Sequence, residues 1–94
     1  MPFQSSPNRL SVLRKQNGLS QKQLAALVGQ DRTMISMYER GRAMPSLSVA
    51  AMFQLLFGLN VADIFPGLFR QLEQELESKR QTLGRHVVER VQAQ

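Results

Sequence analysis

The sequence contains no cysteine and no tryptophan, and its one histidine is His86. Without cysteine the chain has no disulfide framework, no thiolate metal site and no catalytic thiol. With a single histidine, no group of His, Asp and Glu residues has the spacing of a metal site, and no nucleophile has a nearby base. We therefore expect neither an enzyme nor a bound metal or cofactor.

Long apolar runs and a leader segment are also missing. The first ten residues lack the charged segment and apolar stretch of a signal peptide. The most apolar stretch, residues 49–65, is interrupted by Gln54, Gly58, Asn60 and Asp63, which indicates a buried core segment rather than a membrane span. We expect a cytoplasmic protein with no membrane partner. Ninety-four residues suffice for one small domain with a modest core.

Acidic residues are scarce in the first half of the chain, and none precedes Asp31. Residues 1–45 contain seven Lys and Arg residues and two acidic residues, whereas residues 46–94 contain five of each kind. The net charge of +5 therefore lies entirely in the first half. A basic face kept for solubility is one interpretation. The segregation favours a polyanionic partner, because solubility does not require it.

What the sequence does contain is a series of helix start and stop signals, with almost no strand signal. The N-cap signals are Ser6 (followed by Pro7), Ser20, Asp31, Ser46 and Asn60. The stop signals are Gly18, Gly29, Gly41, Gly58 and Pro66. Gln23 completes a capping box with Ser20, and Asp63 repeats this pattern with Asn60. Apolar residues at helical spacing predict the buried faces: Leu10 and Leu13; Leu24, Leu27 and Val28; Ile35 and Tyr38; Leu47, Ala50, Phe53, Leu56 and Phe57. These signals predict five helices in about sixty residues, a compact all-α unit.

Three stretches carry motifs in a specific order: LRKQNGLSQKQLAALVG (residues 13–29), MISMYERGRAMPS (residues 34–46) and LLFGLNVADIFP (residues 55–66). Together they resemble the Cro/phage-repressor-type helix-turn-helix family, often called the XRE family. The resemblance covers about residues 7–66 and implies a five-helix repressor-like domain that binds double-stranded DNA. In such a fold the second helix crosses the DNA backbone and the third lies in the major groove. Gln30 and Asp31 depart from the family pattern, which usually has an apolar residue and then Ser or Thr.

The third predicted helix is expected to read DNA bases. Helical spacing puts Ile35 and Tyr38 toward the core and leaves the opposite face free. We predict base contacts from four residues of that face: Arg32, Thr33, Ser36 and Met37. Donors, hydroxyls and a methyl-bearing chain match the acceptors, donors and thymine methyl of base edges. A plain solvated surface is the alternative. However, a cation at the position of Arg32 opposes the helix dipole and costs stability, which favours a role for Arg32 in DNA contact.

Other polar residues are predicted to bind phosphates or to hold the motif together. The predicted phosphate contacts are Lys15, Gln21, Lys22, Arg40 and Arg42. For Gln21 the resemblance implies that its amide and the N–H groups of its helix turn grip a phosphate; an ordinary helix former is the alternative. Glu39 is disfavoured by the dipole of its own helix end. The resemblance implies that it pairs with Arg14 and fixes the angle of the third helix.

Residues 67–94 lie outside the resemblance and are predicted to form a C-terminal helical extension to a DNA-binding domain of residues 1–66. Apolar residues recur there with a period of about 3.6, which indicates a straight amphipathic helix rather than a sustained heptad coiled coil. Gly84 is a candidate break in it. The predicted dimer contacts are Leu72, Leu76, Leu83, Val87 and Val91. The alternatives are packing on the chain's own domain and binding of a different protein. The carboxylates Glu73, Glu75 and Glu77 have basic helical partners and indicate a solvated face.

The leading functional prediction is a homodimeric repressor that regulates transcription by reading a palindromic operator. A two-fold dimer doubles the contacts of one small domain and places the two third helices about 34 Å apart, one turn of DNA. The alternative is an antitoxin-type autoregulator whose C-terminal helix also binds a second protein.

Overall fold

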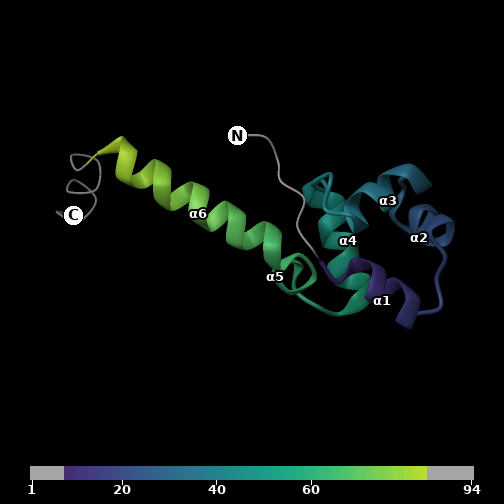
Figure 1. Ribbon diagram of the computed structural model, residues 1–94. Helices are drawn as coiled ribbons and strands as arrows, with labels where there is room; N and C mark the ends of the chain where they lie inside the picture. Colours follow the sequence, from purple (N-terminus) through teal and green to yellow (C-terminus); the bar gives the residue numbers. More distant parts are fainter. Residues whose placement is uncertain (1–7, 85–94) are drawn as a thin grey trace.

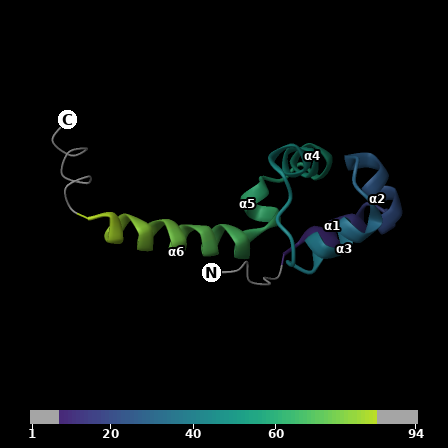
Figure 2. The same ribbon diagram turned by 90° about the horizontal axis from the view of Figure 1, so that it is seen from above.

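The computed structural model describes residues 8–84, and all regular structure within this range is helical. Six helices follow one another: α1 (Leu10–Gln16), α2 (Gln21–Val28), α3 (Arg32–Glu39), α4 (Leu47–Phe57), α5 (Val61–Ile64) and α6 (Pro66–Leu83). Helices α1–α5 form a bundle, and α6 projects from it as a rod in both views (Figure 1, Figure 2). The overall extents are 52 × 26 × 20 Å. The predicted all-α unit of five helices with an added C-terminal helix is confirmed.

The helix ends follow the predicted capping chemistry in most places. The side chain of Ser20 accepts a hydrogen bond from the Gln23 N–H, and Gln23 Oε1 accepts one from the Ser20 N–H, which completes the capping box. Asp31 caps α3 by accepting from the Met34 N–H at 2.8 Å. After α1 the chain turns at Gly18 with φ +67°, a conformation that favours glycine. These ends fix the short joints between α1 and α2 and between α2 and α3.

The hydrophobic core is shared by α1–α5 and the first turn of α6. Phe53 of α4 is fully buried at its centre, with the rings of Tyr38 and Phe65 each 6.1 Å away between centroids. The other buried apolar members of this cluster are Leu10, Leu13, Leu24, Ala25, Val28, Ile35, Val49, Ile64 and Leu68. Because Leu68 belongs to α6, this helix is anchored to the bundle at its N-terminal end only.

Two of the predicted buried faces are wrong in part. Leu27 is 56% exposed because α2 turns Leu24, Ala25 and Val28 inward instead. Leu47 is 87% exposed because it is the first residue of α4, beyond the edge of the core. Leu56 is also exposed, and the inner face of α4 is centred on Val49, Ala50 and Phe53.

One predicted helix start and one predicted capping box are also wrong. Helix α1 begins at Leu10 rather than directly after Ser6, because the Asn8 side chain accepts a hydrogen bond from the Leu10 N–H and holds residues 8 and 9 in a non-helical path. Asn60 makes no side-chain cap on α5; instead Gln54 Oε1 accepts from the Val61 N–H at 3.1 Å. The predicted capping box of Asn60 and Asp63 is therefore absent.

The C-terminal extension is helical from Pro66 to Leu83, and its C-cap is Gly84, with φ +95°. Leu72, Leu76 and Leu83 are 39%, 60% and 62% exposed, so nothing in residues 8–84 covers the predicted dimer contact. Val87 and Val91 lie outside the described residues. Among the helices of residues 8–84, none is long and apolar enough to cross a membrane.

Candidate nucleic-acid interface

Helices α2 and α3 pack together across the short joint at residues 29–31, and α3 presents a polar face to solvent. Ile35 and Tyr38 point into the core from the inner side of α3, as predicted. Arg32 and Thr33 are exposed in the first turn of the helix, and Ser36 and Met37 are half-buried beside them. The four predicted base-contact residues therefore lie on one short helix outside the core.

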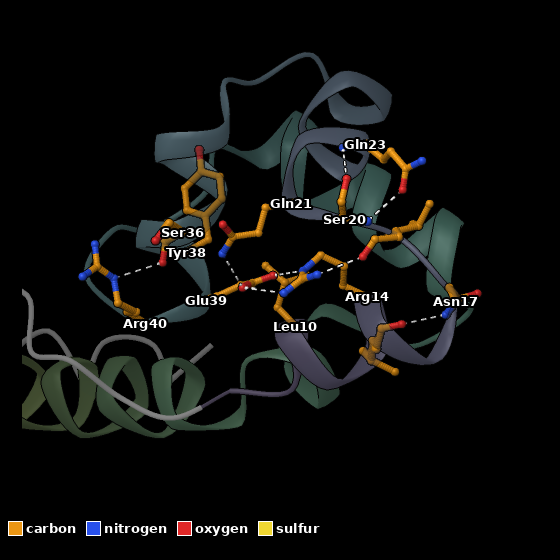
Figure 3. A network of polar contacts seen from close by, with 12 residues as sticks. Leu10, Arg14, Asn17, Ser20, Gln21, Gln23, Ser36, Tyr38, Glu39 and Arg40 are labelled. Carbon is orange, nitrogen blue, oxygen red and sulfur yellow. Dashed lines mark hydrogen bonds and ion pairs between the residues drawn. The ribbon is translucent and has the colours of Figure 1, made fainter.

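The predicted pair of Arg14 and Glu39 forms, and the structure adds Gln21 to it (Figure 3). Arg14 Nε donates to Glu39 Oε2 at 2.5 Å, and Arg14 Nη2 donates to Oε1 at 3.4 Å. Gln21 Nε2 donates to the same Oε1 at 3.0 Å. Arg14 Nη1 donates to the carbonyl oxygen of Leu19 at 2.8 Å. One carboxylate thus joins α1, the start of α2 and the end of α3.

This network is largely removed from water. The side chains of Arg14 and Glu39 are only 11% and 7% exposed. A buried guanidinium–carboxylate pair is favourable when the remaining donors also have partners, and the Leu19 carbonyl supplies one of these. Loss of either charge would leave the other buried without its partner. The network therefore links α3 to the two helices that precede it.

The predicted phosphate contacts occupy different environments. Lys15, Lys22, Arg40 and Arg42 are exposed. Arg40 stands at the C-cap of α3, where its Nε donates to the Ser36 carbonyl oxygen at 3.4 Å. Gln21 is half-buried and its amide is held by Glu39, a contact that the sequence did not predict.

Two further polar residues hold α3 in place and were missed by the sequence interpretation. Asn8 Nδ2 donates to the Tyr38 carbonyl oxygen at 2.8 Å, so the side chain that accepts from the first N–H of α1 also binds the end of α3. Gln30 Oε1 accepts from the Tyr38 hydroxyl at 3.3 Å. An Asn two residues before an apolar run is a recognisable capping signal, whereas the contact of Gln30 with Tyr38 depends on tertiary packing.

Tyr38 contributes a titratable hydroxyl to the buried side of α3. Burial raises the pKa of its hydroxyl above the usual 10.0, and the nearby Asp31 carboxylate raises it further. The neutral phenol therefore remains the stable form over a wide pH range, which keeps its hydrogen bond to Gln30 intact.

Residues 8–84 contain no group of three or more His, Asp or Glu residues that could hold a metal ion. Helices α2 and α3 are short and successive, and α3 has an exposed polar first turn with basic residues on both sides. This arrangement defines a helix-turn-helix DNA-binding unit.

Comparison with known proteins gives the same class. Residues 10–64 match the family described as Helix-turn-helix. The chain is 35% identical over 57 residues to the HTH-type transcriptional regulator PuuR of Escherichia coli, which covers 61% of this chain and 31% of that protein. It is 36% identical over 58 residues to an uncharacterized HTH-type transcriptional regulator of Methanocaldococcus jannaschii, covering 62% of this chain and 88% of that protein. The chain belongs to the XRE-type helix-turn-helix family of DNA-binding domains.

A solved structure is similar over much of the chain. The clp gene regulator ClgR of Corynebacterium glutamicum matches with a TM-score of 0.53 and 26% identity, over 74% of this chain and 79% of that one. The family is not enzymatic, which confirms the interpretation drawn from the missing catalytic residues. The chain spans about a third of the length of the E. coli regulator.

Proposed function

We propose that this protein regulates transcription as a homodimeric repressor that reads a palindromic operator through α3. The observation that carries the proposal is the exposed first turn of α3, where Arg32 and Thr33 stand free while the other face is buried. In a helix-turn-helix domain the first residues of this helix meet the base edges in the major groove. An arginine there can donate two hydrogen bonds to guanine.

The start of α2 supplies a matching phosphate site. The capping box uses the N–H groups of Ser20 and Gln23, which leaves those of Gln21 and Lys22 at a positive helix end. Because Glu39 holds the Gln21 amide, the side chain is oriented before DNA arrives. The exposed Lys22 adds a cation at the same end. Such contacts position the protein on DNA without reading its sequence.

Selection of bound fragments from random double-stranded DNA tests the proposal. We expect the protein to select a palindrome. Arg32→Ala should lower specific affinity by about 1–3 kcal/mol and relax the preference at one base pair of each half-site. Lys22→Ala should weaken binding to all DNA sequences by the same factor, because a phosphate contact carries no sequence information. Arg70→Ala, an exposed arginine of α6, serves as the control for loss of one positive charge.

The outcomes separate the parts of the proposal. If Arg32→Ala lost affinity with no change in preference, α3 would not be the reader. If no sequence were enriched, sequence-specific binding would be wrong. A reporter gene with the selected site across its promoter measures the sign of regulation, and increased expression would exclude a repressor.

A further inference from the structure

Helix α6 carries an apolar surface with no cover in the described part of the chain. We call the residues Phe69, Leu72, Leu76 and Leu83 the α6 stripe; they are 39%, 39%, 60% and 62% exposed. Positions 69, 72, 76, 79 and 83 are separated by alternating steps of three and four residues, which is the spacing of a seam between two paired helices. Lys79 is the single charged member of this series. The seam therefore fits another helix, and Lys79 restricts which orientation that helix can take.

Charge is ordered along the same helix. Arg70 comes first, Glu73, Glu75 and Glu77 occupy the middle, and Lys79 and Arg80 follow. Within the helix Lys79 Nζ lies 3.0 Å from Glu75 Oε1, and Arg80 Nη1 lies 3.7 Å from Glu77 Oε1. All four of these side chains are more than half exposed, so they remain accessible to charges from outside. The helix thus has an acidic middle and a basic end beside one apolar stripe.

We propose that the α6 stripe pairs with the same stripe of a second copy of this chain, with the two helices antiparallel. The proposal rests on the homodimer proposed above and defines its interface. A parallel pair in register would place Lys79 against its own copy in the seam, where like charges repel. An antiparallel pair places Lys79 opposite Leu76 of the other copy and Leu72 opposite Leu83. It also brings Glu73 close to Arg80, so that acidic and basic segments face each other.

The antiparallel arrangement also separates the two DNA-binding domains. With Leu72 opposite Leu83, the two Pro66 residues lie 23 helical positions apart along the pair, or about 35 Å at 1.5 Å per residue. A parallel pair would hold them only about 8–10 Å apart. Each bundle is attached at the N-terminal end of its own α6 (Figure 1). An antiparallel pair therefore places the two domains at opposite ends.

The absence of native cysteine makes a disulfide test direct. The variants Leu72→Cys and Leu83→Cys are prepared as full chains, oxidised mildly alone and as an equimolar mixture, and separated without reductant. The expected product is a covalent dimer in the mixture only, in about half of the dimers if subunits exchange at random. Each variant alone should stay uncrosslinked, because equal positions would be about 16 Å apart, beyond the reach of a disulfide. Ser78→Cys, on the far side of α6, is the control and should not crosslink.

Sedimentation of the unmodified chain is run beside the test and separates two kinds of failure. A dimer that gives crosslinks from each variant alone would overturn the antiparallel orientation. A dimer that gives no crosslink in the mixture would place its interface elsewhere and overturn the assignment of the α6 stripe, with the homodimer retained. A monomer at all concentrations, with and without operator DNA, would overturn both the stripe pairing and the homodimer.

Discussion

The α1–α5 bundle and the projecting α6 have the same helical spacing of apolar residues, yet these side chains are buried in the bundle and exposed on α6. In the bundle Leu10, Leu24 and Ile35 are completely buried. On α6 the corresponding stripe stays 39–62% exposed, and Leu68 alone is buried. Periodicity therefore specifies that a segment is an amphipathic helix, but the partner that covers its face depends on tertiary structure.

Charged residues show the same contrast. The Arg14–Glu39 pair has side chains 11% and 7% exposed, and further hydrogen bonds tie it to Gln21 and Leu19. The Lys79–Glu75 pair has side chains 73% and 52% exposed. The first pair can hold helices at a fixed angle, because breaking it leaves a buried charge without a partner and costs free energy. The second contributes little to stability, because water screens it.

The largest expected effect tests the apolar half of this comparison. Leu24→Ala should lower the free energy of unfolding by about 2–5 kcal/mol, because it leaves a cavity in a fully buried site. The matched change Leu76→Ala should act only through the dimer, so its effect should vanish as the protein is diluted. Urea unfolding at two protein concentrations measures both. A loss for Leu76→Ala that persists on dilution would mean that the α6 stripe packs within its own chain.

The second effect tests the charged half. Glu39→Gln should cost about 3 kcal/mol, because Arg14 then keeps its charge without a carboxylate partner. Glu75→Gln, the same chemical change in an exposed pair, should cost less than about 1 kcal/mol. Thermal unfolding compares the two variants. Equal midpoints would remove the structural role of the Arg14–Glu39 pair. DNA affinity should also fall for Glu39→Gln, through displacement of α3.

The parts of the fold that local chemistry determines could be predicted from the sequence. Gly18, Gly29 and Gly58 end helices because each adopts a φ near +68°, which is accessible mainly to glycine. The caps at Ser20 and Asp31 form within three residues of chain. Such signals depend only on near neighbours, and they gave the order of the helices and the position of the turn before α3.

The parts that depend on distant neighbours could not be predicted in the same way. Leu27 and Leu24 are both leucines at helical spacing, and only the packing of α2 decides that Ala25 takes the inner position in place of Leu27. The contact between Gln21 and Glu39 joins residues 18 positions apart. Arg14–Glu39 was anticipated through the family resemblance, not through spacing. The base contacts of α3 and the dimer contact of α6 stay predictions.

The third effect is smaller and compares two hydroxyl groups, one that caps a helix in the bundle and one on the surface of α6. Ser20→Ala should cost about 1 kcal/mol, because the Gln23 N–H loses its acceptor and the capping box opens. Thr82→Ala should be neutral or slightly stabilising, since its hydroxyl only donates to the Ser78 carbonyl within the helix and alanine is the better helix former. Chemical denaturation resolves a difference of this size. A cost for Thr82→Ala as large as that for Ser20→Ala would contradict the distinction between the two regions.

The smallest expected effect concerns Tyr38, which links the core of the bundle to the turn before α3. Near pH 7 Tyr38→Phe should cost about 0.5–1 kcal/mol, because the hydrogen bond to Gln30 is lost. The raised pKa of Tyr38 adds a pH dependence: its stabilisation is fully present below the usual pKa of 10.0 and is lost as the pH rises through the higher pKa of the folded state. The phenylalanine variant lacks this loss, so the stability difference between the two proteins should shrink above about pH 10. Urea unfolding of both proteins from neutral to alkaline pH measures the difference, and the other titrating groups cancel. A difference that stayed constant over this range would show that Tyr38 is no more protected from ionisation in the bundle than in the unfolded chain.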